Sequence, residues 1–105
     1  MDNNARILHF LGIANRAGKT AAGEEACRRA RKYGGKLFLV IVAHDAGENT
    51  REHVARWCRE NSIPLFTFGT REQLGRFTGR GEVSTAGITD EGFSRRLSEM
   101  LTGVD

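Results

Sequence analysis

Gly18, Lys19 and Thr20 are the residue types that close a phosphate-binding loop. Such a loop needs a strand leading into it, a glycine five positions before the second glycine, and a helix that starts at the lysine. Here Ile13 stands where that first glycine is needed, and Gly23 follows too soon for a helix that begins at Lys19. The residues before the tripeptide also have helical rather than strand spacing. We therefore expect no nucleotide site here.

No other set of side chains has the spacing of a catalytic or metal centre. Glu24 and Glu25 are sequential, so on a helix they diverge by about 100° and cannot act as an acid and base pair. Cys27 and Cys58 fall at apolar helical positions and are predicted to be buried, reduced thiols. No two histidines have the spacing of ligands on one helix face; they are His9, His44 and His53. We expect no enzyme activity, metal, cofactor or small-molecule substrate.

The composition is that of an ordinary folded protein. Of the 105 residues, 39% are hydrophobic, 28% are charged and one is proline. This length provides one hydrophobic core, so we expect a single domain over residues 1–105. The apolar run at 7–14 is short and contains His9, which argues against a signal peptide or a membrane span. We expect a cytoplasmic protein without a membrane partner.

The positive charge is concentrated near the N-terminus. The net charge is +3, and residues 1–36 hold eight Lys and Arg against three Asp and Glu. The other two thirds of the chain each have a small acidic excess. A localised basic surface is typical of proteins that bind a polyanion, although many solvated helix faces have the same composition.

Apolar periodicity predicts helices and strands in alternation. Spacings of three to four residues predict helices at 7–14, 23–34, 49–61, 70–77, and from Thr89 or Asp90 to 101. Residues 36–43 are the central strand, 63–69 a second strand, 19–22 a short extended piece, and 79–88 a loop into a weak last strand. This order predicts a three-layer α/β/α sandwich around a small sheet, largely parallel or mixed.

Two local patterns add detail to these elements. Asn49 with Glu52, and Thr70 with Gln73, have the spacing of a capping box at a helix start. Aromatic residues are few, and Tyr33 and Trp57 fall at apparent core positions. We therefore do not expect an aromatic platform for stacking bases.

Three stretches carry a resemblance to a known family. The order of a glycine, a helix with charged first turns and an apolar strand resembles the ribosomal proteins of the L7Ae type that bind kink-turn RNA. The stretches "LGIANRAGKTAAGEEA", "VIVAHDAGENT" and "AGITDEGFSRRL" look like the bacterial YlxQ-like branch of that family. The match extends from about residue 7 to 97, and the ordered set is more specific than any one stretch. The resemblance implies the same three-layer sandwich.

The resemblance also implies where RNA is bound. Kink-turn binders present an Asn, a Glu and a Lys from the helix after the glycine to tandem sheared G·A pairs. Counted from Gly23, these positions hold Glu25, Ala26 and Arg29, so only the basic position is retained. The loops at 44–49 and 80–85 are implied to flank the site. Standard kink-turn recognition is therefore in question, whereas RNA binding in general is not.

These observations favour a non-catalytic protein that binds structured RNA, either ribosomal or of another kind. The expected RNA-binding residues combine helix and loop positions: Lys19, Gly23, Glu24, Glu25, Arg28, Arg29, Arg80, Gly81, Val83 and Ser84. The alternative is a protein-interaction module that kept the fold and lost the RNA. An exposed apolar patch at the two loops would favour that alternative. The sequence leaves the oligomeric state open.

Overall fold

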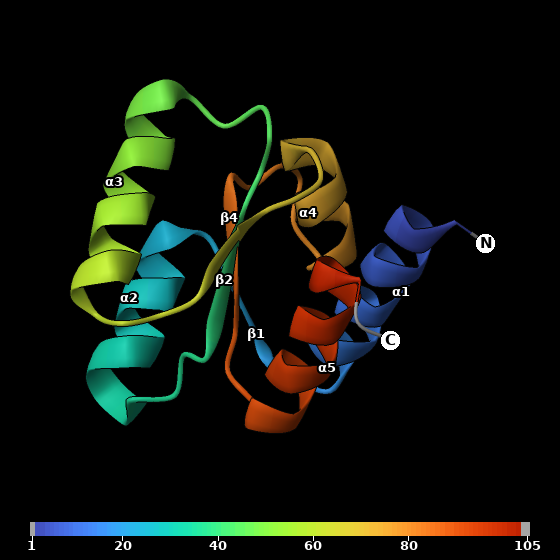
Figure 1. Cartoon of the computed structure of the whole chain (residues 1–105), viewed down its shortest axis with the longest axis horizontal. Coiled ribbons are helices and arrows are strands. Elements are labelled where there is room, and N and C mark those ends of the chain that lie inside the picture. The colour runs from blue at the N-terminus through green and yellow to red at the C-terminus, as the bar shows by residue number, and fades with distance from the viewer. Residues whose placement is uncertain (1, 104–105) are drawn as a thin grey trace.

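A four-stranded sheet forms the middle layer of the structure (Figure 1). The computed structural model describes residues 2–103. Along the chain the elements are α1 (Asn3–Arg16), β1 (Thr20–Ala22), α2 (Glu24–Gly34), β2 (Leu39–Val42), α3 (Glu48–Glu60), β3 (Leu65–Thr67), α4 (Arg71–Phe77), β4 (Thr85–Ile88) and α5 (Glu91–Thr102). Helices α2 and α3 cover one face of the sheet, and α1, α4 and α5 cover the other (Figure 1). The expected α/β/α sandwich is confirmed.

The sheet is mixed, with the strand order β1-β4-β2-β3. Strand β2 is parallel to β3, whereas β4 is antiparallel to both β1 and β2. Strand β4 was expected to be weak, yet it is internal and all four of its residues are buried. Gly87 permits this, because a Cβ there would lie 2.6 Å from Cδ1 of Leu37 and 2.8 Å from Sγ of Cys27. The small residues of β4 let α2 lie close to the sheet.

A separate apolar cluster lies on each face of the sheet. The cluster beneath α2 and α3 contains Cys27 and Cys58, which are free and buried. Burial raises the pKa of Cys27 to about 12 and that of Cys58 to about 11. Both side chains are therefore neutral thiols at physiological pH, which confirms the prediction of buried, unpaired cysteines.

The helix starts confirm one of the two predicted capping boxes. The amide of Gln73 donates to Thr70 Oγ1 at 3.1 Å, and the amide of Thr70 donates to Gln73 Oε1 at 3.0 Å. The box predicted from Asn49 is wrong, because the N-cap of α3 is Gly47, two residues earlier, and Asn49 lies within the helix. Since Ala46 is buried in the core, the chain enters the helix sooner than the sequence pattern indicated.

Tyr33 was predicted to be a core residue, and this is wrong. Its exposed fraction is 75%, whereas Leu37 is buried in the same cluster as Cys27. Helix α2 ends at Gly34, and Gly35 adopts a left-handed conformation that turns the chain. Leu37 thus fills the core at this end of α2, and the tyrosine ring remains in solvent. Trp57, by contrast, packs against the cluster.

Candidate nucleic-acid interface

Three helix N-termini and two loops meet at one edge of the sheet, which is uppermost in Figure 1. The pairing of Ala22 with Ala86 and of Val42 with Thr85 aligns the ends of β1 and β2 with the start of β4. Helices α2, α3 and α4 each begin just after strands β1, β2 and β3 end there. We call residues 23–26, 43–47 and 80–84 the loop edge.

Backbone hydrogen bonds join these segments to one another. The amide of Gly23 donates to the carbonyl of Thr85, and the amide of Ala43 donates to the carbonyl of Ser84, both at 2.8 Å. Gly23, Arg80, Gly81, Val83 and Ser84 of the expected site therefore lie in one connected region. Because the contacts are made by backbone atoms, they fix the shape of the edge with little dependence on the side chains.

The loop at 80–84 is held against helix α4. The amide of Arg80 donates to the carbonyl of Gly75 at 2.7 Å, and that of Val83 donates to the carbonyl of Arg71 at 3.2 Å. A Cβ on Gly75 would lie 2.6 Å from the carbonyl oxygen of Gly81, so only glycine permits this contact. The loop is thus an ordered wall of the edge.

Helix α2 presents an uncapped N-terminus to the same edge. Gly23 is its N-cap and supplies no side-chain hydrogen bond. The first amides of a helix point outwards and favour a negatively charged partner such as a phosphate. Glu24 and Glu25 occupy this first turn and counter part of that preference.

The two arginines of the expected site have different surroundings. Arg28 donates from Nε and Nη2 to Oε2 of Glu24 at 3.2 and 2.8 Å, and its guanidinium carbon lies 5.3 Å from the centre of the Trp57 ring. His53 Nδ1 lies 3.4 Å from the same carboxylate oxygen. Arg28 therefore connects α2 to α3 and is largely occupied within the protein.

Arg29 is more available than its neighbour. It pairs with Glu25 at 3.1 Å, but its side chain is 58% exposed and that of Glu25 is 86% exposed. Exposed pairs of this kind contribute little to stability, so another anion can replace the carboxylate at small cost. Of the two arginines, Arg29 is the better placed to bind a phosphate.

Lys19 lies away from the loop edge. It precedes β1, whose first residue pairs with Ile88 at the opposite end of β4. Its neighbours there include Arg29, Tyr33 and Lys36. The Gly-Lys-Thr tripeptide forms the turn from α1 into β1, and a strand rather than a helix follows the lysine.

Sequence reasoning missed Arg71, which lies at the rim of the loop edge. Its amide donates to Asp45 Oδ1 at 2.8 Å, and its guanidinium lies 3.8 Å from carboxylate oxygens of both Asp45 and Glu82. It links the loop after β2 with the loop before β4. The capping box at Thr70 marked the helix start beside it, but no local pattern indicated the partners across the edge.

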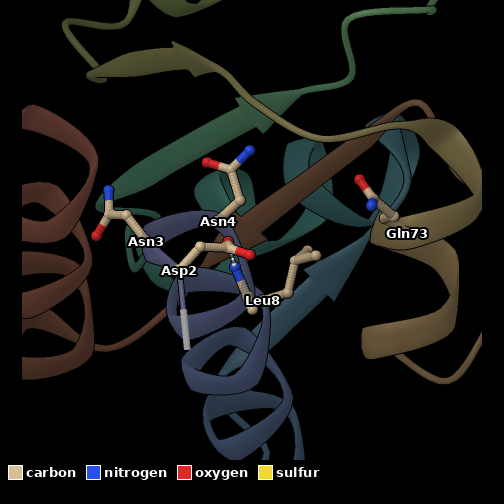
Figure 2. A pocket seen from close by; sticks show the side chains of 6 residues that line it. Asp2, Asn3, Asn4, Leu8 and Gln73 are labelled. Atoms are coloured by element: carbon tan, nitrogen blue, oxygen red, sulfur yellow. Dashed lines mark hydrogen bonds between the residues drawn. The ribbon is translucent and has the colours of Figure 1, made fainter.

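A hollow on the described surface lies elsewhere, at the start of α1 (Figure 2). Its lining has side-chain amides and one carboxylate but no cation: Asp2, Asn3, Asn4, Ala5, Leu8 and Gln73. The carboxylate of Asp2 already accepts a hydrogen bond from the amide of Ala5 at 2.8 Å (Figure 2). A polyanion finds no positive partner there.

Within residues 2–103, no three metal-ligating side chains form a cluster that could hold a metal ion. In the same range, no helix is long and apolar enough to cross a membrane.

Residues 5–98 match the model of the ribosomal protein L7Ae/L30e/S12e/Gadd45 family. The chain belongs to this family. The L7Ae-family chain is 34% identical over 92 residues to RNA-binding protein YlxQ of Bacillus subtilis, covering 88% of this chain and 91% of that protein. With RNA-binding protein YlxQ of Enterococcus faecium, it is 31% identical over 101 residues, and 96% of each chain is covered. These relatives agree with the YlxQ-like branch indicated by the sequence.

Solved structures share the fold of this L7Ae-family chain. A Bacillus halodurans protein of unknown function has a TM-score of 0.84 and 35% identity, with 93% of this chain and 98% of that chain covered. The 15.5kD RNA-binding protein of Giardia lamblia has a TM-score of 0.73 at 22% identity, with 99% and 88% covered. The second likeness concerns the fold alone.

Proposed function

We propose that this L7Ae-family protein binds a structured RNA at the loop edge and does so without catalysis. The observation that carries the proposal is the meeting of the uncapped α2 N-terminus with the ordered 80–84 loop at one sheet edge. Relatives named RNA-binding protein YlxQ support RNA as the ligand. A relative from Sulfurisphaera tokodaii, 29% identical over 90 residues, is named large ribosomal subunit protein eL30, which supports a ribosomal target in the cytoplasm.

The geometry favours recognition of a bent RNA by its shape. Amides at the helix start can hold phosphates, while the two loops form a wall against which an unstacked nucleotide can lie. Arg29 supplies the cation in the position that kink-turn binders reserve for a lysine. The edge therefore suits a sharply bent backbone better than a straight duplex.

A standard kink-turn should be bound weakly. Glu25 lacks the amide donor of an asparagine and adds a negative charge, and its side chain is 86% exposed and so accessible to a ligand. Ala26 lacks an acceptor for guanine N–H groups. We infer that the natural RNA is bent but differs from the standard kink-turn at the paired bases read by this helix.

The rival function, a protein-interaction module, predicts an exposed apolar patch at the loops. The exposed large hydrophobic residues of the described chain are Ile13 and Tyr33, which lie outside the loop edge. Val83 in the loop is partly buried. The surface of the edge thus supports RNA over an apolar protein partner.

A photo-crosslinking amino acid placed in cells at residue 82 tests this proposal. Glu82 is exposed at the loop edge, and Glu60, exposed at the far end of α3, is the matched control. We expect sequencing to recover a defined structured RNA from position 82 and not from position 60. Recovery of no RNA from position 82, or of the same RNAs from both positions, would contradict it.

A further inference from the structure

A second charged area lies at the other end of α2, away from the loop edge. Three cations line a shallow depression there, together with small residues and one aromatic: Gly18, Lys19, Arg29, Ala30, Tyr33, Gly34, Lys36 and Thr89. The lining contains no carboxylate. Nζ of Lys32 adds a fourth charge, 5.2 Å from the centre of the Tyr33 ring. We call Lys19, Arg29, Lys32, Tyr33 and Lys36 the tyrosine patch.

The exposed ring is the unusual feature of this patch. Tyr33 is 75% exposed, whereas Trp57 packs against the core. Leu37 fills the nearby core, so packing does not require an aromatic residue at position 33. Proteins that bind single-stranded nucleic acids combine a flat ring with cations, because bases stack on the ring and phosphates contact the charges.

A simpler account covers only part of the patch. Basic residues in the last turn of a helix stabilise its dipole, and Arg31 and Lys32 occupy that turn of α2. Lys19 and Lys36 lie outside the helix, on the turns before β1 and after α2. Three segments of the chain therefore bring positive charge to one ring, which the helix dipole does not explain.

We propose that the tyrosine patch binds a single-stranded segment of RNA, with one base stacked on Tyr33 and the adjacent phosphates beside Lys19, Arg29 and Lys36. The inference rests on the proposed function, because the segment is taken to flank the bent RNA at the loop edge. Helix α2 is 11 residues long, roughly 16 Å at 1.5 Å per residue, a distance that a few nucleotides span. Arg29 lies between the two regions.

Fluorine NMR tests stacking directly, because the chain has a single tyrosine. Protein labelled with 3-fluorotyrosine gives one side-chain resonance from Tyr33. We expect a ten-nucleotide oligo(A) to shift this resonance and to bind roughly tenfold more weakly to Tyr33→Ala, the loss expected for one stacked base. Tyr33→Phe, studied by affinity alone, should bind nearly as well as the unmodified protein.

A charge-matched pair of variants tests the phosphate contacts. Lys19→Gln with Lys36→Gln should reduce the salt dependence of oligo(A) binding by about 1.4 in log–log slope, near 0.7 for each lost phosphate contact. Arg51→Gln with Arg56→Gln removes the same charge from exposed positions of α3 and should leave that slope nearly unchanged.

Three results would overturn the proposal that the tyrosine patch binds single-stranded RNA. They are a fluorine resonance that oligo(A) does not move, a Tyr33→Ala protein that binds oligo(A) normally, and an equal shift caused by poly-glutamate, which would indicate an acidic protein partner. A kink-turn hairpin without single-stranded ends is titrated in parallel into the Glu25→Asn with Ala26→Glu protein, which is expected to bind it. Failure of this hairpin to bind, while Tyr33-dependent oligo(A) binding is retained, would contradict the loop edge alone. Hairpin binding without Tyr33-dependent oligo(A) binding would contradict the tyrosine patch alone.

Discussion

The two ends of helix α2 present charge in different ways. Beside the loop edge, two arginines are paired within the protein: Arg28 with Glu24, and Arg71 with Asp45 and Glu82. At the tyrosine patch, Lys19, Lys32 and Lys36 form no ion pair with any acidic residue that the structure describes. The loop edge is therefore built for shape and the patch for charge and stacking. Salt should weaken contacts at the patch more than contacts at the edge.

Gly75→Ala should separate the two regions most strongly. The new Cβ would lie 2.6 Å from the carbonyl oxygen of Gly81 and would push the 80–84 loop off α4. We expect the free energy of unfolding to fall by about 1–3 kcal/mol. Hairpin affinity should fall more than tenfold, while oligo(A) affinity remains, as measured on folded protein by fluorescence anisotropy.

Gly81→Ala is the matched control for this change. No atom lies within 4 Å of a Cβ at position 81, so stability should be retained. Because Gly81 belongs to the loop edge, hairpin affinity should fall, but less than in Gly75→Ala, and oligo(A) affinity should be retained. Equal losses in the two variants would mean that the position of the loop does not control the edge.

The double change Glu25→Asn with Ala26→Glu should improve the loop edge alone. It supplies the donor and the acceptor that kink-turn binders direct at the G·A pairs, each worth on the order of 1–3 kcal/mol. Kink-turn affinity should rise tenfold or more at one fixed salt concentration, with less effect on a duplex without these pairs. Tight kink-turn binding by the unmodified protein would show instead that other residues read the motif.

Arg28→Ala should mainly reduce stability, whereas Arg29→Ala should mainly reduce RNA affinity. Removing Arg28 breaks its pair with Glu24 and its contact with Trp57, so we expect a loss of about 1 kcal/mol in stability with little change in affinity. Removing Arg29 should weaken both RNAs and reduce the salt slope by about one for a structured RNA. Denaturant titration measures the loss of stability, and fluorescence anisotropy measures the loss of RNA affinity. If the two variants behave identically, Arg28 and Arg29 do not have the different roles assigned to them.

Thiol labelling tests whether α2 stays packed on the sheet and so keeps the loop edge and the tyrosine patch apart. Of the predictions made here, it has the smallest expected effect, because RNA affinity does not change. The thiolate is the reactive form, and burial raises the pKa of Cys27 to about 12 from 9.0. At pH 8 the thiolate fraction of Cys27 is thus roughly a thousandfold below that of an exposed thiol. Native protein should react slowly and unfolded protein at once, and reactivity should rise with pH. Fast native reaction would mean that α2 leaves the sheet.

The layers of the fold could be predicted because apolar periodicity reports burial directly. The sequence predicted β4 only as a weak strand, because Gly87 has a low strand propensity. Its lack of a side chain instead allows Leu37 and Cys27 to pack closely against the strand. The exposure of Tyr33 was missed because helical spacing does not show where the chain turns. These failures depend on contacts between distant segments, which a local pattern does not contain.

The candidate site could also be predicted in part, and its unpredicted features again depend on contacts between distant segments. Strand pairing brings Gly23 to Thr85, the residue after Ser84, so the loop before β4 lies beside the start of α2. Lys19 is only four residues before Gly23, but the strand between them is extended and separates them by roughly 13 Å. The pairing of Arg28 with Glu24 was visible in the spacing of four residues, whereas the contact with Trp57 required the fold.

Amide chemical shifts measured during titration with a bent RNA hairpin test the central claim most directly. With nitrogen-15-labelled protein, we predict the largest changes at residues 23–26 and 81–84, with small changes at 56–60 on the far end of α3. Changes confined to the exposed surface of α1 and α5, or an absence of changes at 23–26 and 81–84 under saturating RNA, would contradict the assignment of the loop edge as the RNA-binding surface.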